Sequence, residues 1–214
     1  RFWGVARPKV YITRKIPQQA IEMVRAAADV RLWDREDAPP PRDVILREVR
    51  DVDGVLSLLT DRMDGEVMDA APHLRVVSNF AVGFDNIDVP AATQRRIVVT
   101  NTPEVLTETV ADFAVCLMLA AARRLVEADR YTRAGRWKTW EPMLLAGQDL
   151  YRATLGLIGL GRIGSAVVRR VKGFEMRVLY YDVFRREDLE RSQGIEFRPM
   201  AEVLREADFV SVHV

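Results

Sequence analysis

One stretch, residues 154–182, constrains what this chain can fold into more than any other (TLGLIGLGRIGSAVVRRVKGFEMRVLYYD). It begins with an apolar run of strand type, and Gly159, Gly161 and Gly164 follow at G-x-G-x-x-G spacing. Apolar residues then recur at steps of three and four, which is typical of one helix face. A second apolar run ends at Asp182. The stretch therefore predicts a βαβ unit of about 30 residues.

Each glycine of this motif has a physical role in binding a dinucleotide. Gly159 lets the chain turn sharply, Gly161 leaves room for a pyrophosphate beside bare backbone, and Gly164 lets helix and strand pack closely. The N–H groups around Arg162 and Ile163, at the positive end of the helix dipole, are expected to hold the phosphates. The alternative is a plain tight turn, which the matching strand, helix and acidic residue argue against.

Asp182 ends the second strand, where it can accept hydrogen bonds from both hydroxyls of the adenosine ribose. Its charge would repel a 2′-phosphate, so the sequence favours NAD. Arg185 and Arg186 leave NADP open, because an arginine just past the strand can take that phosphate. The alternative for Asp182 alone is an ordinary solvated loop aspartate. We expect Gly173 to end the intervening helix in a left-handed conformation.

Composition and charge exclude several classes of protein. The 214 residues are 49% hydrophobic and 29% charged with a net charge of +1, so nothing indicates a nucleic-acid or membrane-surface partner. The single cysteine, Cys116, has no partner for an internal disulfide, and a reduced, cytoplasmic setting is expected. The longest uncharged apolar run, residues 113–122, is too short to span a bilayer. The first residue is Arg1 and the last apolar run stops at Val214, from which we expect a fragment truncated at both ends.

Strands and helices alternate before residue 100, which predicts a parallel sheet covered on both faces. The expected strands are residues 9–13, 30–33, 53–60, 74–79 and 97–100, and the expected helices are residues 17–28, 44–49 and 63–71. This region has no glycine motif of its own, so we expect a second α/β domain.

After residue 100 the pattern predicts a long helix over residues 107–124, apolar nearly all round and therefore buried on several sides. Thr102 or Thr107 is its expected cap. Residues 125–151 are expected to form a polar connection. Its aromatic residues, Trp137 and Trp140, either mark a subunit contact or pack under a loop. A helix over residues 201–206 and a last strand complete the pattern.

Four segments together resemble the D-isomer-specific 2-hydroxyacid dehydrogenases, and within them the glyoxylate/hydroxypyruvate reductases. They are residues 79–88 (NFAVGFDNID), 99–103 (VTNTP), 159–164 and 208–214. The resemblance implies an α/β fold with a flavodoxin-like substrate domain, residues 1–101, and a Rossmann-like, doubly wound dinucleotide-binding domain, residues 102–214, truncated C-terminally. It also implies a homodimer and the NAD(P)-dependent reduction of a 2-oxo acid.

The resemblance implies roles for eight further residues. Leu59, Thr60 and the backbone of Val82 and Gly83 match the positions that hold the substrate carboxylate, Leu106 and Val110 those that face the nicotinamide, and His213 and Val214 those beside the adenosine half. Backbone N–H groups at a strand-to-loop turn suit an anion. The alternative for Leu59, Leu106 and Val110 is hydrophobic core, and Gly83 also reads as a turn glycine.

No catalytic residue is assigned within the chain. Reducing a ketone needs a proton donor and a cation for the carboxylate, which the resemblance gives to an arginine, a glutamate and a histidine expected after Val214. His73 and His213 are the only histidines, and neither matches that position. We therefore expect no turnover by these 214 residues alone. The alternatives are a phosphoglycerate, D-lactate or formate dehydrogenase, or an NAD-sensing protein resembling a corepressor.

Overall fold

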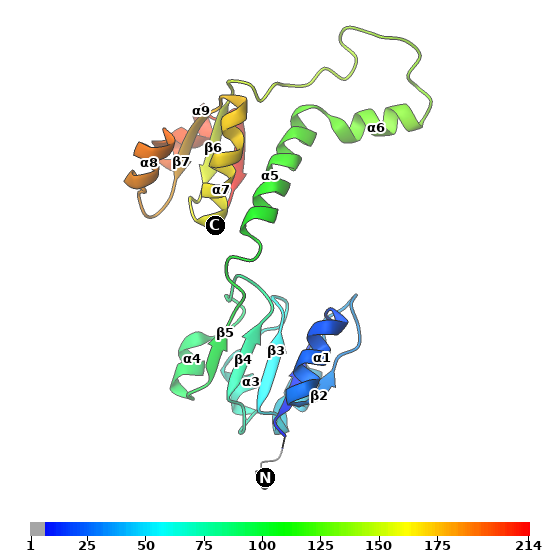
Figure 1. The fold of residues 1–214 in the computed structure, drawn as a ribbon, viewed down its shortest axis with the longest axis vertical. Coiled ribbons are helices and arrows are strands. Elements are labelled where there is room, and N and C mark those ends of the chain that lie inside the picture. The colour runs from blue at the N-terminus through cyan, green and yellow to red at the C-terminus, as the bar shows by residue number, and fades with distance from the viewer. Residues whose placement is uncertain (1–6) are drawn as a thin grey trace. The chain divides into compact units, whose positions relative to one another are not determined.

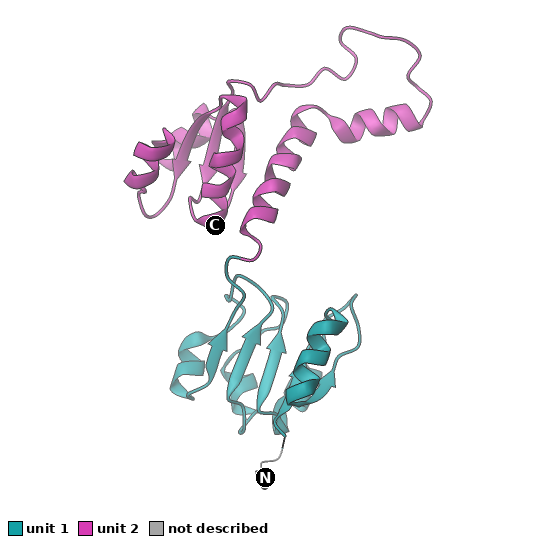
Figure 2. Ribbon diagram, in the orientation of Figure 1, with its two compact units in different colours: residues 1–104 teal, residues 105–214 magenta. Residues whose placement is uncertain are grey.

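The computed structural model describes residues 7–214, which divide into two compact units. Unit 1 comprises residues 1–104 and unit 2 residues 105–214 (Figure 2). The boundary predicted between residues 101 and 102 lies just before this division. Each unit contains one parallel sheet, so the predicted α/β class is confirmed.

The sheet of unit 1 has five parallel strands in the order β2-β1-β3-β4-β5. They are β1 (Lys9–Ile12), β2 (Asp29–Leu32), β3 (Gly54–Ser57), β4 (Val76–Asn79) and β5 (Val98–Thr100). This is the flavodoxin-like strand order, in which ligands bind beyond the carboxyl ends of the strands. A binding site of unit 1 is therefore expected beyond the carboxyl ends of β3 and β4.

Helices cover both faces of this sheet because successive strand side chains alternate in direction. The helical segments are α1 (Gln18–Ala27), α2 (Arg42–Glu48), η1 (Val49–Asp51), α3 (Gly65–Asp69) and α4 (Val89–Gln94). Tyr11 of β1 packs in the core shared with α2, α3 and α4, whereas its neighbour Ile12 packs with Ile21 of α1. Helix α4 was not predicted, although Asp88 caps it by accepting the Ala91 N–H at 2.9 Å.

The sheet of unit 2 has four parallel strands in the order β8-β7-β6-β9. They are β6 (Thr154–Ile158), β7 (Arg177–Tyr181), β8 (Glu196–Phe197) and β9 (Phe209–Val212). Numbered within the unit, this order is 3-2-1-4, the first part of the doubly wound dinucleotide-binding sheet. The Rossmann-like prediction is confirmed.

Helices also cover both faces of this second sheet (Figure 1). The helical segments of unit 2 are α5 (Thr107–Ala122), α6 (Leu125–Arg133), α7 (Arg162–Val171), η2 (Lys172–Phe174), α8 (Glu187–Gln193) and α9 (Met200–Glu206), of which α5, α7 and α9 pack on the sheet. Leu155 and Leu157 of β6 share a core with α5 and α7. Gly156 between them faces α9, where an added Cβ would lie 2.6 Å from the Val203 side chain. Close packing of α9 therefore requires a glycine at that position.

Three details of the sequence prediction were wrong. Helix α5 begins at Thr107, and the residue before it, Leu106, makes no side-chain cap, so neither proposed threonine caps the helix. Glu104 has φ +72°, which a right-handed helix starting at Pro103 cannot accommodate. The left-handed residue after α7 is Glu175, with φ 52°, and not Gly173. Helices α6 and α8 and strand β8 were also missed.

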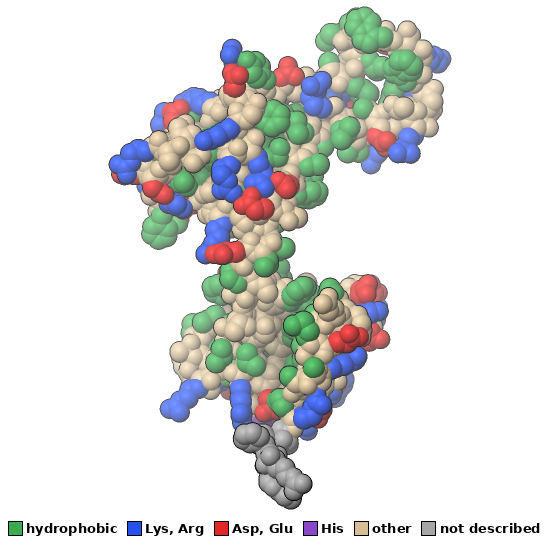
Figure 3. All heavy atoms as spheres, in the orientation of Figure 1, with side chains coloured by type: hydrophobic (Ala, Val, Ile, Leu, Met, Phe, Trp, Pro, Cys, Tyr) green, Lys and Arg blue, Asp and Glu red, His purple; other side chains and the backbone are tan. Residues whose placement is uncertain are grey.

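Within this chain helix α5 is buried on one side only, and burial on its other sides, expected between domains or subunits, stays a prediction. It packs along α7, where Arg170 pairs with both Glu108 and Asp112. Phe113 and Leu117 remain exposed. Helix α6 and the connection after it extend away from the sheet of unit 2, with hydrophobic side chains gathered on them (Figures 1 and 3). Within residues 7–214 no helix is long and apolar enough to cross a membrane.

Candidate functional site

The glycine turn joins β6 to α7 and holds three strands together at its tip. Gly159 has φ +93°, and its N–H donates to the Tyr181 carbonyl of β7 at 2.8 Å. On the other side, the His213 N–H after β9 donates to the Ile158 carbonyl at 2.7 Å. A Cβ at Gly159 would lie 2.5 Å from the His213 carbonyl oxygen. Gly159 is therefore required both by its backbone angle and by the close approach of the chain after β9.

The other two glycines of the motif differ in their surroundings. A Cβ at Gly164 would lie 2.5 Å from the Gly159 carbonyl oxygen, so Gly164 allows helix α7 to start directly against the turn. A Cβ at Gly161 would meet no atom within 4 Å. The protein itself therefore does not need a glycine at position 161. An open backbone at the start of α7, where Ile163 and Gly164 present first-turn N–H groups, suits a pyrophosphate.

Asp182 lies directly beyond β7, with its carboxylate turned toward this glycine turn. One oxygen accepts the Leu160 N–H at 2.6 Å and the other accepts the Phe184 N–H at 3.1 Å. These backbone hydrogen bonds lower the pKa of Asp182, so the group is ionised at neutral pH. Each carboxylate oxygen has a second lone pair free of these bonds, so Asp182 can still accept hydrogen bonds from two ribose hydroxyls.

Both arginines beyond β7 are engaged in bidentate ion pairs. Arg185 donates to both oxygens of Glu190, at 2.9 and 2.8 Å, and Arg186 donates to both oxygens of Asp188, at 3.1 and 3.0 Å. The buried Tyr180 hydroxyl also donates to Glu190, at 2.8 Å. These bonds lower the pKa of Glu190 to about 2. Arg185 and Arg186, the two cations that could bind the 2′-phosphate of NADP, are thus paired with neighbouring carboxylates.

A groove of about 440 Å³ runs between α5 and β9 in unit 2 and brings two predicted residues together. Val110 lines it from α5 and His213 from the chain after β9. The His213 ring lies 2.8 Å from the Ser211 hydroxyl, and burial lowers the pKa of His213. Leu106 is 46% exposed and Val214 almost fully exposed, so neither belongs to the core. Their predicted contacts with a nicotinamide dinucleotide remain predictions.

The four residues predicted to hold the substrate carboxylate come together in unit 1. Leu59 and Thr60 follow β3, and Val82 and Gly83 follow β4. A Cβ added to Gly83 would lie 3.8 Å from the Leu59 side chain, so the two loops touch. Leu59 is 59% exposed, which excludes the core interpretation. In the described part of the chain none of these four backbone N–H groups donates to a protein acceptor. We call this group of four N–H donors the carboxylate nest.

A buried polar network lies under the carboxylate nest and was not predicted. Asp61 is 1% exposed and accepts the Thr13 hydroxyl at 2.5 Å and the Leu58 N–H at 2.7 Å. Asn79 is fully buried and donates to the Gly83 carbonyl at 2.9 Å. The sequence did contain a signal, because the polar Asn79 ends a strand that begins with two valines. Polar side chains at the carboxyl ends of buried strands are unusual unless they are hydrogen-bonded.

No metal site accompanies these groups: among residues 7–214, no cluster of three or more His, Cys, Asp or Glu side chains could hold an ion. Arg14 extends from the end of β1 and donates to the Thr60 hydroxyl at 3.0 Å, which adds one cation beside the carboxylate nest.

Comparison with known proteins gives a consistent result. Residues 115–214 match the family model described as the NAD-binding domain of D-isomer-specific 2-hydroxyacid dehydrogenases. A glyoxylate reductase from Korarchaeum cryptofilum is 55% identical over 209 residues, and one from Thermococcus kodakarensis is 53% identical over 212 residues. Each match covers 97% of this chain. The chain spans 63% of the length of these two relatives.

Solved structures also resemble this chain. The TT0316 protein of Thermus thermophilus aligns with a TM-score of 0.88 and 41% identity, covering 96% of this chain and 64% of that one. An NADPH-dependent glyoxylate/hydroxypyruvate reductase from Sinorhizobium meliloti, in complex with NADP and malonate, aligns with a TM-score of 0.78 and 35% identity. That match covers 98% of this chain and 63% of the other.

Proposed function

We propose a function from one premise: this chain belongs to the D-isomer-specific 2-hydroxyacid dehydrogenase family, and residues 115–214 match that family's NAD-binding domain. The whole protein, in this proposal, reduces glyoxylate or hydroxypyruvate to the 2-hydroxy acid with NADH, in the cytoplasm. The observation that carries the proposal is the pair formed by Gly161, with open space beside it, and Asp182, held against the same turn.

The residues of unit 2 fit a nicotinamide dinucleotide. The turn from Gly159 to Gly164, including Arg162 and Ile163, is assigned to the pyrophosphate and Asp182 to the adenosine ribose. His213 and Val214 are assigned to the adenosine half, and Leu106 and Val110 to the nicotinamide ring. When bound, the reduced nicotinamide supplies the hydride that reaches the 2-oxo carbon.

The carboxylate nest of unit 1 is assigned to the substrate. Four N–H groups can share the charge of a small 2-oxo acid's carboxylate, and fixing that carboxylate orients the adjacent carbonyl for reduction. Leu59 supplies an exposed apolar side chain beside the carboxylate nest, which suits a substrate with a short carbon chain. We assign no residue of this chain as the proton donor, so these 214 residues alone are predicted to show no turnover.

The test of this function is steady-state kinetics on the whole protein with a panel of 2-oxo acids. We expect kcat/KM for glyoxylate or hydroxypyruvate to exceed that for pyruvate and 3-phosphohydroxypyruvate by at least about 10-fold. A preference for pyruvate or for the phosphorylated acid would identify another dehydrogenase of the family. NADH binding without oxidation of the cofactor by any panel member would instead indicate a sensing protein.

NADH is expected to be preferred over NADPH, because Asp182 is ionised and Arg185 and Arg186 are paired. Replacing Asp182 by serine removes the repulsion of the 2′-phosphate. We expect Asp182→Ser to shift the ratio of kcat/KM for NADPH to that for NADH upward by about 10- to 100-fold. A wild-type preference for NADPH would overturn the role given to Asp182.

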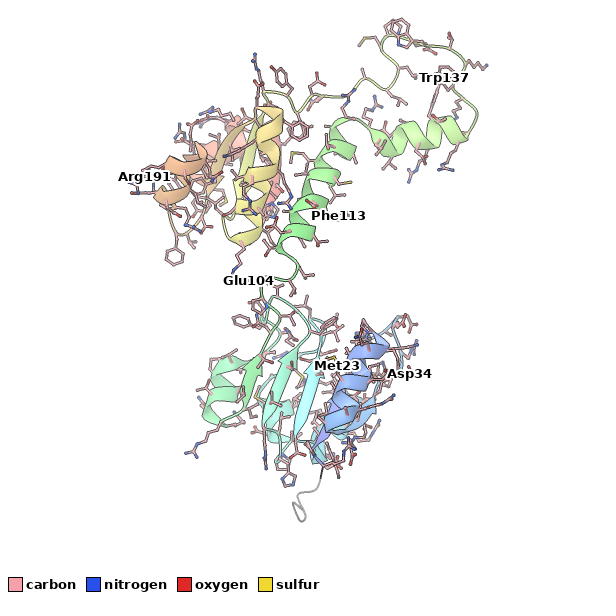
Figure 4. The ribbon with its side chains drawn as sticks, viewed as in Figure 1. Met23, Asp34, Glu104, Phe113, Trp137 and Arg191 are labelled. Carbon is pink, nitrogen blue, oxygen red and sulfur yellow. The ribbon has the colours of Figure 1, made fainter. Side chains whose placement is uncertain are left out.

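A homodimer is also proposed, with a second copy of the chain covering the exposed apolar side chains of α5 and of the connection that includes α6. Phe113 on α5 and Trp137 on that connection are labelled in Figure 4, and Trp140 and Met143 are more exposed still. An exposed apolar surface of this kind is typical of a protein interface. Sedimentation equilibrium of the whole protein measures its oligomeric state, and a monomer at micromolar concentration would contradict the proposal.

A further inference from the structure

Two loops that are distant in the sequence form the carboxylate nest, so their relative position decides whether its four N–H groups can meet one anion. The first loop, residues 58–61, is a tight turn in which the Asp61 N–H donates to the Leu58 carbonyl at 3.0 Å. The second loop, residues 80–87, is longer. Main-chain bonds tie their ends: the Phe80 N–H donates to the Ser57 carbonyl at 2.7 Å, and the Met63 N–H donates to the Asn86 carbonyl at 2.8 Å. Side-chain hydrogen bonds join the loops themselves.

The side-chain amide of Asn86 joins the two loops. Its Nδ2 donates to the Leu58 carbonyl at 3.1 Å and to the Asp61 carbonyl at 2.9 Å, so Asn86 binds both ends of the tight turn. Because both partners are carbonyl oxygens, the nitrogen of this amide must be the atom that faces them. Asn86 itself lies in the second loop, and the contact therefore bridges the two halves of the carboxylate nest.

Asn79 extends this contact to the other half. Its Nδ2 donates to the Asn86 Oδ1 at 3.0 Å and to the Gly83 carbonyl at 2.9 Å. Its Oδ1 accepts from Ser57 at 3.0 Å and from Asn86 at 3.3 Å. The two amides thus form a reciprocal pair whose outer bonds end on loop 58–61 and on Gly83. These bonds are buried or half-buried, so each is costly to break without replacement.

We infer that Asn86 is a positioning residue for the substrate, which acts by fixing loop 58–61 against loop 80–87 so that the N–H groups of Leu59, Thr60, Val82 and Gly83 converge on one carboxylate. This inference rests on the proposed function, in which the carboxylate nest binds a 2-oxo acid. Asn86 does not itself contact the substrate. Its backbone N–H is not one of the four donors, and its side chain is occupied by the two loops.

The neighbouring Ser57 provides a matched control. Ser57 is buried, whereas Asn86 is half-buried, and both donate to the Asn79 amide, but the Ser57 hydroxyl makes no hydrogen bond to either loop within residues 7–214. Substituting either residue by alanine removes hydrogen bonds that are buried or half-buried and is expected to lower the melting temperature. Only the substitution of Asn86 removes hydrogen bonds from the second loop to the carbonyls of loop 58–61. If Asn86 had a purely structural role, the two variants would change KM for glyoxylate alike. If Asn86 positions the loops, only Asn86→Ala raises this KM.

The experiment compares the whole protein with its Asn86→Ala and Ser57→Ala variants, well below both melting temperatures. For Asn86→Ala we expect KM for glyoxylate to rise about 10-fold or more, with KM for NADH within twofold of wild type. Hydrogen exchange of a peptide spanning residues 58–61 should accelerate. For Ser57→Ala we expect KM for glyoxylate within twofold of wild type. Equal changes in the two variants, or no change in Asn86→Ala, would overturn the inference.

Oxalate binding separates this inference from the proposed reaction. Calorimetry with oxalate, a dicarboxylate that mimics the substrate, measures the carboxylate nest without turnover. Weakening of oxalate binding by about 10-fold in Asn86→Ala, but not in Ser57→Ala, supports the inference even if the protein reduces a different 2-oxo acid. If Asn86→Ala yields too little folded protein, Asn86→Ser replaces it in the experiment, because a serine side chain is too short to reach both the Leu58 and the Asp61 carbonyl. We expect the same direction with a smaller change.

Discussion

The two sheets place backbone N–H groups at their carboxyl ends in opposite ways. In unit 2 glycines leave the N–H groups uncovered. Gly159 and Gly164 allow backbone to pack against backbone, and Gly161 leaves open space beside the start of α7. In unit 1 side chains position the N–H groups, because the amides of Asn79 and Asn86 hydrogen-bond two irregular loops to each other. The first arrangement depends on a helix for its order, and the second depends on two side-chain amides.

This difference has a consequence for tolerance to mutation. The glycine turn fails when a Cβ is added at Gly159 or Gly164, because the new atom meets a backbone oxygen at 2.5 Å. An amide network fails when a donor is removed, because the carbonyls it served are left without a partner. Substitutions that add atoms should therefore be most damaging in unit 2, and substitutions that delete hydrogen-bond donors in unit 1.

The largest effect is expected from Gly159→Ala. The substitution places a side chain on a residue with φ +93° and puts its Cβ 2.5 Å from the His213 carbonyl oxygen. We expect NADH affinity of the whole protein to fall by more than about 100-fold and the free energy of unfolding to fall by about 2–4 kcal/mol. Fluorescence titration and urea denaturation measure the two effects.

Gly173→Ala is the control for Gly159→Ala, because a Cβ at Gly173 meets no atom within 4 Å and its φ is not positive. It should change neither NADH affinity nor stability by a measurable amount. If both alanine variants bind NADH like the wild type, the glycine turn does not hold the cofactor.

Gly161→Ala sharpens the comparison, because it separates binding from folding. Its Cβ meets no protein atom, so the urea midpoint should stay the same or rise slightly. The same Cβ would occupy the space assigned to the pyrophosphate, and we expect the Kd for NADH to rise by about 10- to 100-fold. Unchanged affinity would show that the cofactor does not approach the backbone at this point.

The smallest effects are expected from two buried tyrosines, one in each sheet. The Tyr180 hydroxyl donates to Glu190 and accepts the Arg186 N–H at 2.8 Å. The Tyr11 hydroxyl is buried and finds no partner within residues 7–214. We expect Tyr180→Phe to lower the free energy of unfolding by about 1–2 kcal/mol, and Tyr11→Phe to leave it unchanged or raise it by up to about 1 kcal/mol. Equal losses in both variants would contradict this difference.

The same pair predicts how stability responds to alkali. Burial raises the pKa of both Tyr11 and Tyr180 to about 12, above the value of about 10 in an unfolded chain. The folded state therefore holds these protons more tightly. The resulting stability is complete below about pH 10 and is lost as the pH rises toward 12. Urea midpoints at pH 9 and pH 11.5 should differ less in each phenylalanine variant than in the wild type.

The sequence alone determined the parts of this protein that depend on local pattern. Alternating strands and helices predicted two parallel sheets, and the glycine spacing with Asp182 predicted which turn faces a dinucleotide. The two sheets and the close packing at Gly159 and Gly164 are confirmed, because strand and helix periods and the sterics of glycine act over a few residues. Dinucleotide binding at this turn stays a prediction. The local sequence also misled in places, because the positive φ of Glu104 and Glu175 is imposed by surrounding structure.

Folding in three dimensions was needed for everything that joins distant segments. The pairing of Arg170 with Asp112, the closure of Gly159 against His213, and the amide contact between loops 58–61 and 80–87 are all absent from any local pattern. Hydrogen bonds and ion pairs act over a few ångströms, so which groups meet depends on the packing of the sheets and helices that carry them. The resemblance identified the backbone of the carboxylate nest from the sequence, but not the side-chain amides of Asn79 and Asn86 beside it.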